Sequence, residues 1–436
     1  MRSRGSRALL IILAVALLAR LVVIVATPDF KPIFDAAHYD RLGASIAHGH
    51  GYPGQFDPAT PSAFRPPLYP LALAAVHLVG GGWTAERVLS ALLGVVAVLL
   101  VFLVAERLWG RRVALVAAAI AAVFPPLVVL SASLLSESLF VPLTLGVVLA
   151  TLEYRRTRQL RWAVAAGALG GLGALTRTNG LLLVLAAAIG VWVARPLLRR
   201  SSLMAPTVVA VAAVVVVTPW VVRNTIEFHR FVGISTQTGY ALGATYNPQA
   251  GRLHPAGTPR MTWLVYPGLF HAPLDEGERS SRLTNHAIDY ATGHPSYVVK
   301  TLVWNTLRVF DLHHDGSFKT GFQAGYLQAV GDARLASPLV PIAIYVVLAL
   351  ALVGAAGQAG LVRTRRAPVF VWAFPVLLVV PAIAVFGLSR YRSPIDPFLA
   401  MLAAVALVAV FERVSVRGAA PAYGTRALRA ARRSSA

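Results

Sequence analysis

Apolar segments about as long as a membrane span recur along almost the whole of this 436-residue chain. A helix of about 20 predominantly apolar residues can cross the hydrocarbon core of a bilayer. The composition agrees, because 57% of the residues are hydrophobic and only 13% are charged, whereas soluble domains carry roughly 25% charged residues. We therefore exclude a soluble protein and predict an all-α polytopic membrane protein.

We expect about ten transmembrane helices, within a range of about nine to twelve. The first apolar run follows a basic start, as in a signal peptide, but it is longer than the apolar core of most signal peptides. We therefore expect it to be retained as the first span. The predicted spans are 8–26, 86–105, 112–131, 138–153, 162–175, 180–194, 203–222, 337–356, 368–387 and 396–412.

Basic residues are concentrated in the links that this threading places on one side of the membrane. These links read ERLWGRR, EYRRTRQLR, ARPLLRR and LVRTRR, and both ends of the chain are also rich in arginine. Because positively charged loops stay in the cytoplasm, we predict a multi-pass protein of the plasma (inner) membrane with both termini cytoplasmic. The pattern accounts for the net charge of +22 without a nucleic-acid partner, and the basic cytoplasmic tail at 413–436 suits anionic membrane lipids.

The opposite, extracytoplasmic side receives two long polar segments. A first loop at 27–85 belongs to an N-terminal catalytic module at 1–222, and a second segment at 223–336 precedes the last spans at 337–412. The apolar run at 66–82 is not counted as a span, because it is short, opens with two prolines and closes with three glycines. It suits a helix that lies at the interface or re-enters the membrane.

The first loop contains the sequence DAAHYDRLGASIAHG, in which apolar and polar positions alternate as in an amphipathic helix on the membrane surface. Asp35 begins this sequence and has two interpretations. An aspartate at a helix start often caps the helix. Alternatively, it is a carboxylate base that faces an extracytoplasmic cavity, where nearby apolar groups raise its proton affinity. We take Asp35 as a candidate catalytic residue.

Two further charged residues stand out on the same side. Arg65 in FRPPLYP precedes a proline, which keeps it out of helical geometry, and its planar guanidinium suits phosphate; the alternative is contact with lipid headgroups. Glu137 in SASLLSESLF lies at the edge of an apolar span, where a carboxylate is costly unless partnered; the alternative is a favourable position at a helix N-terminus. We take Glu137 as a second candidate catalytic residue.

Arginines and tyrosines recur at the other extracytoplasmic turns, although the positive-inside rule disfavours cations there. With the first loop, these turns suggest a ring of substrate-binding side chains. The ring comprises Tyr39, Asp40, Arg65, Tyr69, Arg177, Arg223, Arg390, Tyr391 and Arg392. The chain lacks a P-loop, so an ATP motor is not indicated, and the absence of cysteine excludes a thiol mechanism. We assign no metal ligands, and a divalent cation remains open as a cofactor.

The order of an early acidic motif, RPPLYPLALA and the stretch from ERVLSALLG to SASLLSESLF resembles the GT-C membrane glycosyltransferases. It is most similar to the family 39 type, which includes protein O-mannosyltransferases and the aminoarabinose transferases of lipid A. The resemblance is best over residues 30–195, with later echoes in PWVVRN, ISTQTGYALGATYNP and SRYRSPIDPFL. It implies a GT-C fold and transfer of a sugar from a polyprenyl-phosphate donor to an acceptor on the outer face.

The resemblance also implies roles for individual residues. By motif position, the first-loop acid that serves as base in this family falls on Asp35, the second acid on Glu137, and the basic residue before PPL on Arg65. The chain departs from the family where many relatives have a paired Asp-Glu and it has DAAHY, and where lysine often precedes PPL. Whether Asp35 or Asp40 is the base therefore stays open; a helical spacing of five residues places them on different faces.

The residues suit sugar transfer from a lipid-linked phosphate even without the family resemblance. A lipid-linked sugar leaves as a phosphate anion, so the site needs arginines for that anion and a carboxylate for the acceptor's proton. The hypothesis is Asp35 as base, Arg65 with Arg390 or Arg392 on the phosphate, and an orienting role for Glu137. The acceptor is a lipid, a glycan or a protein. The competing interpretation is a polytopic transporter or glycolipid flippase, which predicts two related halves with discontinuous helices.

Overall fold

The computed structural model of the protein describes residues 2–55, 57–193, 200–313, 339–360 and 364–418. Within these ranges the regular structure is helical, and extended pairing is confined to one isolated bridge between Pro53 and Pro61. The all-α prediction is therefore confirmed. Most of the predicted basic tail, at 419–436, lies outside the described residues.

Every predicted span overlaps a helix of the structure. Five described helices are long and apolar enough to cross a membrane. The helices that correspond to the predicted spans are α1 (Arg2–Ala26), α4 (Trp83–Trp109), α5 (Arg111–Val123), α7 (Glu137–Thr157), α8 (Leu160–Thr176), α9 (Leu181–Val191), α10 (Arg200–Glu227), α18 (Leu339–Ala359), α19 (Ala373–Ala384) and α20 (Asp396–Gly418).

Two of the predicted spans are interrupted. The span at 112–131 is divided at Phe124 into α5 and the short α6 (Pro125–Leu130), because two successive prolines lack the backbone N–H that would continue the helix. The span at 368–387 begins as a 3₁₀ turn, η4 (Val369–Trp372), and α19 follows directly and ends at Ala384. At Phe124, prolines therefore shorten a helix where hydropathy alone predicts a continuous one.

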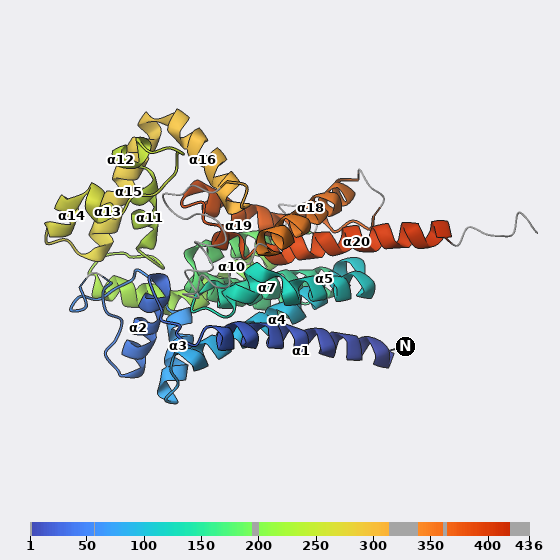
Figure 1. The fold of residues 1–436 in the computed structure, drawn as a ribbon. Helices are drawn as coiled ribbons and strands as arrows, with labels where there is room; N and C mark the ends of the chain where they lie inside the picture. Colours follow the sequence, from blue (N-terminus) through green and yellow to red (C-terminus); the bar gives the residue numbers. More distant parts are fainter. Residues whose placement is uncertain (1, 56, 194–199, 314–338, 361–363, 419–436) are drawn as a thin grey trace, which may run out of the picture.

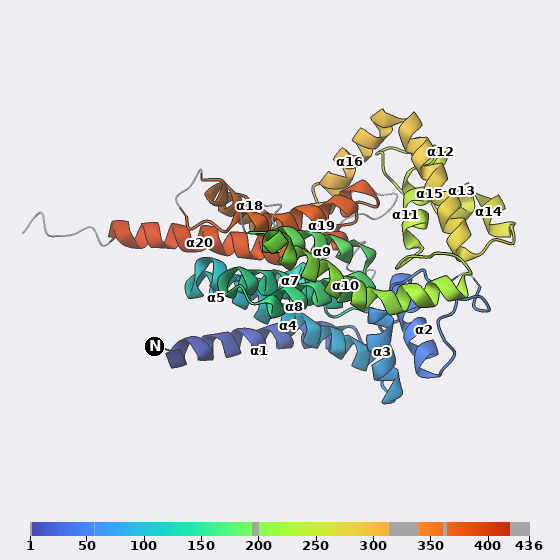
Figure 2. The same cartoon turned by 180° about the vertical axis from the view of Figure 1, so that it is seen from behind.

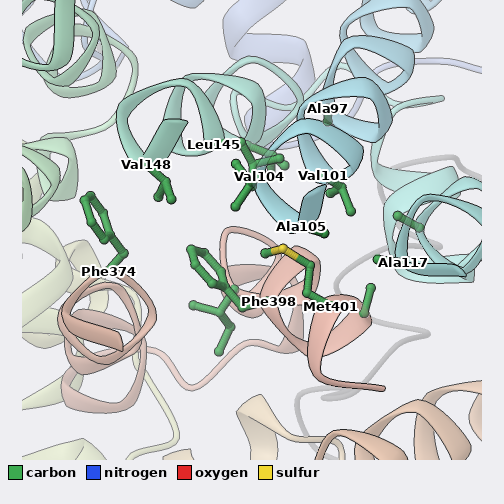
Figure 3. Packing of buried hydrophobic residues seen from close by; sticks show 14 of the residues in the cluster. Ala97, Val101, Val104, Ala105, Ala117, Leu145, Val148, Phe374, Phe398 and Met401 are labelled. Carbon is green, nitrogen blue, oxygen red and sulfur yellow. The ribbon is translucent and has the colours of Figure 1, made fainter. Parts of the chain in front are cut away.

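The centre of the bundle is packed with small and branched apolar side chains. Ala105 of α4 and Ala117 of α5 are fully buried, and such small residues let helices approach closely in a membrane. Figure 3 shows Phe398 and Met401 of α20 facing these helices, with Phe374 of α19 beside them. The last helix is thereby fixed against helices from the first third of the chain.

The first loop and the described part of the second segment, 223–313, lie together at one end of the bundle (Figures 1 and 2), while the start of α1 and the end of α20 lie at the other. This is the arrangement that an even number of crossings predicts. The rest of the second segment, 314–336, lies outside the described residues. The first loop forms α2 (Asp35–Ala47) and α3 (Leu68–Leu78), and the second segment forms α11 (Gln237–Thr245), α12 (Pro248–Gly251), α13 (Thr262–Val265), α14 (Pro267–His271), α15 (Glu276–Gly293) and α16 (Pro295–Val309).

The apolar run at 66–82, which was not counted among the spans, contains the short helix α3. This helix has 11 residues, so at about 1.5 Å per residue it covers only about half of the hydrocarbon thickness. Its axis runs across the direction of the bundle in Figure 1. Helix α3 thus ends the first loop as a crosswise element rather than as a span.

A buried carboxylate joins the two polar segments. Glu276 at the start of α15 accepts hydrogen bonds from Ser62 Oγ at 2.9 Å, from the Ala63 backbone N–H at 2.9 Å and from Thr236 Oγ1 at 2.7 Å. Ser62 and Ala63 belong to the first loop, and Thr236 precedes α11. Because this glutamate is only 8% exposed, the bonds have little competition from water and hold the segments in a fixed relation.

Candidate active site

The first residue of α2 carries a carboxylate that two arginines contact. Asp35 Oδ1 accepts a hydrogen bond from Arg65 Nη2 at 2.5 Å, and Oδ2 accepts one from Arg390 Nη2. Arg390 lies in the 3₁₀ turn η5 (Ser389–Arg392), far along the chain from α2. Asp35 does not cap its helix, because Phe34 occupies the N-cap position and no side chain bonds the first turn. The helix-capping interpretation is therefore wrong.

The second predicted acid lies beside the first. Glu137, the first residue of α7, is 1% exposed, and its Oε1 lies 2.7 Å from Arg177 Nη1 and 3.9 Å from Arg390 Nε. The guanidinium of Arg390 therefore lies between the two carboxylates. Arg65 is also buried, at 4% exposure, so it does not lie among lipid headgroups, which was the alternative for this residue.

This cluster carries more positive than negative charge. Arg65, Arg177 and Arg390 supply three guanidinium groups, and Asp35 and Glu137 supply two carboxylates. The neighbouring His38 adds no charge at neutral pH, because burial and the Arg65 guanidinium lower its pKa to about 3. The net charge of these groups is one positive unit, which favours an anionic ligand.

The pKa of Asp35 reflects a competition between opposing effects. Burial raises the pKa, but the charges of Arg65 and Arg390 and their hydrogen bonds lower it by more, so the pKa lies well below the usual range of an aspartate. Asp35 is consequently ionised at neutral pH. A carboxylate in this state can accept a proton once the arginines are engaged elsewhere.

Aromatic rings support the arginines. The Arg65 guanidinium lies 5.0 Å from the ring centre of Tyr39, and those of Arg177 and Arg390 each lie 5.1 Å from the ring centre of Tyr391. Cation–π contacts of this length are attractive and strengthen where water is excluded. The Tyr39 hydroxyl donates to Ser136 Oγ at 3.0 Å. The rings thus restrict the orientation of all three guanidinium groups.

Local backbone conformation brings these side chains together. Arg177 ends α8 in an extended conformation, which turns its side chain out of the helix. The next turn, η1 (Thr178–Gly180), packs closely on α8, since a Cβ on Gly180 would lie 2.2 Å from the carbonyl carbon of Gly173. Only glycine fits at that position. The sequence LTRTNG is therefore folded into a tight corner that presents Arg177.

Two cavities meet at Asp35. Cavity A, of about 160 Å³, lies between the first loop, the 176–179 turn, α11 and the end of α19. Cavity B, of about 280 Å³, lies between α2, α11 and the segments 259–263 and 386–391. Both cavities are lined by Asp35, Arg65, Gln237, Ala241, Phe386 and Tyr391. The carboxylate therefore stands where a ligand in either cavity could reach it.

Four of the predicted ring residues lie away from these cavities. Asp40 is on another side of α2, and Tyr69 is buried with its hydroxyl 3.3 Å from Ser90 Oγ. Arg223 donates to the Ser62 backbone oxygen at 2.6 Å and lines a different groove, which Trp220 also lines. These positions give no support to a role in binding the same substrate.

The fourth is Arg392, which is fully buried. Its Nε lies 2.7 Å from Asp396 Oδ1 and its Nη1 lies 3.0 Å from Asp311 Oδ2. Arg390 and Arg392 were the two candidates to bind the phosphate together with Arg65. Only Arg390 lines one of the two cavities, cavity B. Arg392 connects η5 to α20 and to the end of α16.

Some cavity residues were not among those predicted from the sequence. Gln237 at the start of α11 lines both cavities, and Arg260 and Trp263 line cavity B. Asn179 lines cavity A, and its side-chain oxygen is buried with no hydrogen-bond donor among the described residues. No local pattern in the second segment indicated which of its polar residues lines a cavity with Asp35.

Comparison with known proteins agrees with this architecture. The family model described as dolichyl-phosphate-mannose-protein mannosyltransferase matches residues 64–222, a little over a third of the chain. The archaeal oligosaccharyltransferase AglB from Archaeoglobus fulgidus, solved with an inhibitory peptide and a dolichol-phosphate, superposes with a TM-score of 0.56 at 18% identity over 94% of this chain. The chain therefore shares the fold of this oligosaccharyltransferase over about half of the latter's length, 51%.

Further comparisons delimit this likeness. The apo form of the Archaeoglobus fulgidus oligosaccharyltransferase gives a TM-score of 0.54 at 17% identity over 94% of this chain, and the chain spans 51% of the length of both oligosaccharyltransferase structures. ArnT from Cupriavidus metallidurans bound to undecaprenyl phosphate gives a TM-score of 0.42 at 15% identity, covering 91% of this chain and 77% of ArnT. No curated protein matches the sequence significantly.

Proposed function

We propose that this GT-C protein transfers a hexosyl or pentosyl group from a polyprenyl-phosphate donor to a lipid, glycan or protein acceptor. The observation that carries the proposal is Asp35, held by two arginines where two cavities meet at one end of a membrane bundle. A carboxylate base next to surplus positive charge is what displacement of a phosphate leaving group requires.

The donor phosphate binds in cavity A. This cavity is lined by Arg65 and Arg177, and its apolar wall comes from Pro381, Ala382 and Val385 at the end of α19. A lipid-linked phosphate approaches from the bilayer, so a cavity at the end of a bundle helix suits it better than one enclosed by polar segments. The family description, which names a dolichyl-phosphate sugar, supports the same donor class.

The acceptor binds in cavity B. Its lining includes Trp263 and Met261, both more than 40% exposed, and such partly exposed apolar side chains suit contact with a sugar ring or a peptide. Cavity B lies mainly between the first loop and the second segment, so the second segment selects the acceptor. Asp35 borders both cavities and is the proposed base.

The chemical step follows from these positions. The acceptor hydroxyl transfers its proton to the Asp35 carboxylate while its oxygen forms a bond to the anomeric carbon of the donor sugar. The bond between that carbon and the phosphate oxygen breaks, and polyprenyl phosphate leaves as an anion. Arg65 and Arg177, which line cavity A, stabilise the negative charge that develops on the phosphate. Arg390 adds positive charge from its position between Asp35 and Glu137, and Glu137 orients Arg177 and Arg390.

The basic links support a site on the extracytoplasmic face of the plasma membrane, with both termini in the cytoplasm. The site chemistry also distinguishes the proposal from the transporter alternative. A transporter site would lie near the middle of the membrane between related halves, whereas the paired acids and arginines lie at the end of the bundle that carries the two polar segments.

Transfer of radiolabelled sugar in membranes expressing Asp35→Asn tests the proposal, with a panel of polyprenyl-phosphate sugars as donors. A general base contributes about 10²- to 10⁴-fold to rate, so we expect transfer to fall by at least about 100-fold. Asp29→Asn, at an exposed position of the same loop, is the matched control and should transfer normally. Normal transfer by folded Asp35→Asn would refute the base assignment, and no transfer by wild type from any donor would favour the transporter.

A further inference from the structure

Helices α2, α3 and α4 bring three possible metal ligands together on a side of α2 remote from Asp35. His77 Nε2 lies 3.3 Å from Asp40 Oδ1 and 3.0 Å from Glu86 Oε1. All three ligand atoms lie within 4.8 Å of one another. One imidazole and two carboxylates form a donor set that suits a divalent transition metal.

Glu86 has no protein partner that accounts for its burial. The side chain is 0% exposed, and neither of its carboxylate oxygens accepts a hydrogen bond from the part of the chain that the structure describes. Within the same part, neither Asp40 nor Glu86 forms an ion pair with an arginine or a lysine. A buried carboxylate without such partners is costly, and a bound cation would remove that cost.

Two of the three separations match a tetrahedral site. Ligand atoms at about 2.0–2.1 Å from a zinc ion are about 3.3 Å apart along a tetrahedral edge. The separations from His77 Nε2 are 3.0 and 3.3 Å, and the Asp40 and Glu86 oxygens lie within 4.8 Å of each other. The indole N–H of Trp83 donates to Asp40 Oδ2 at 3.1 Å, as outer hydrogen bonds orient metal-binding carboxylates. Asp40 and His77 remain 17% and 16% exposed, so water can supply the fourth ligand.

We propose that Asp40, His77 and Glu86 bind one divalent transition-metal ion, with Zn²⁺ the best match to the geometry. The ion fastens α2 to α3 and α4. Helix α2 already lies close to α3, since a Cβ on Gly43 would lie 2.8 Å from Leu73 Cβ. The metal therefore fixes the helix whose first residue is Asp35. The inference does not depend on the proposed sugar transfer.

Metal analysis and thermal unfolding of the full-length protein in detergent test the proposal. We expect wild-type protein purified without chelator to hold about one metal ion per chain, as measured by inductively coupled plasma mass spectrometry. Treatment with EDTA should lower the midpoint of thermal unfolding, and Zn²⁺ added in slight excess should restore it. Mn²⁺ serves as a second probe ion and should restore it less.

Two variants address the ligands directly. His77→Gln and Glu86→Gln should each lose the metal and the response of unfolding to Zn²⁺, whereas His50→Gln, an exposed histidine of the same loop, should keep both. If the variants do not fold, the chelation and readdition experiment on wild type still decides. Wild-type protein that holds no metal and does not respond to Zn²⁺ or Mn²⁺ would overturn the proposal.

Discussion

Replacement of Arg390 by glutamine should weaken phosphate binding while the stability of the fold stays nearly unchanged. In this variant the Asp35 carboxylate still pairs with Arg65, and the Glu137 carboxylate still pairs with Arg177. Each carboxylate therefore keeps one partner. We expect the free energy of unfolding to fall by less than about 2 kcal/mol. The net charge of the cluster falls from one positive unit to zero. Arg390 lines cavity B and reaches a phosphate in cavity A by turning away from Asp35. A hydrogen bond to a charged group contributes about 1.5–3 kcal/mol, so affinity for polyprenyl phosphate should weaken about 10- to 150-fold.

Arg392 supplies a contrasting variant only two residues away. It is 0% exposed and pairs with Asp311 and Asp396, which are 3% and 0% exposed. Removal of one partner from a buried ion pair costs about 3–5 kcal/mol. Arg392→Gln should therefore destabilise the fold strongly, whereas Arg390→Gln should leave it nearly intact.

The assay is thermal unfolding of detergent-solubilised protein with increasing polyprenyl phosphate. A ligand that binds the folded state raises the midpoint by an amount that grows with the logarithm of its concentration relative to Kd. Wild type should be stabilised, and Arg390→Gln should need a proportionally higher ligand concentration for the same rise. Two results would refute the reasoning: an Arg390→Gln variant that is stabilised like wild type, or one that unfolds as readily as Arg392→Gln.

Two further predictions concern the framework of the site. Gly180→Ala should lower the free energy of unfolding by about 1–3 kcal/mol, because the added Cβ would lie 2.2 Å from the backbone of Gly173; an unchanged midpoint of thermal unfolding would contradict this packing. Burial raises the pKa of Glu276, so the folded state binds its proton more tightly than the unfolded state. Its contribution to stability should fall as the pH rises from the unfolded-state pKa near about 4.3 through the higher folded-state value. Glu276→Gln should remove that dependence in unfolding curves recorded across this pH range, and curves that keep the wild-type slope would argue against it.

Residues predicted on the same side of the membrane were expected to lie close together, and several of them are in contact. Asp35, Glu137, Arg65 and Arg390 come from separate parts of the chain, and the threading put all of their loops on one side. Hydropathy and charge are read along the chain, so they predict which end of the bundle a turn reaches. They do not predict which side chains at that end come into contact.

Arg390 and Arg392 show this limit within a single motif. The sequence SRYRSP gives no reason to distinguish the two arginines. In the structure, however, η5 is a 3₁₀ turn with about three residues per turn, so residues two apart face different directions. One reaches Asp35, and the other reaches Asp311 through packing against the end of α16. That second partner is 81 residues away in sequence, and no local spacing indicates it.

The cluster of Asp40, His77 and Glu86 escaped sequence analysis for a similar reason. Recognisable metal motifs place ligands at short, regular intervals on one or two elements, whereas these three residues come from three helices joined by an irregular loop. Asp40 was instead taken as a candidate for substrate binding because it shares a motif with Asp35. The helical spacing of five residues did predict that the two aspartates face different ways, and the structure agrees.

The lowered pKa of Asp35 conflicts with a role as base unless the arginines move. A carboxylate held by Arg65 and Arg390 has little affinity for a proton. A donor phosphate would compete for the same guanidinium groups, and once they turn toward it the burial of Asp35 raises its pKa, so the base becomes effective only when donor is bound. Since kcat/KM reports the free enzyme and kcat the bound complex, kcat for transfer should fall at a higher pH on acidification than kcat/KM for the donor. Coincident pH profiles would mean that Asp35 keeps its arginines throughout and that another group takes the proton.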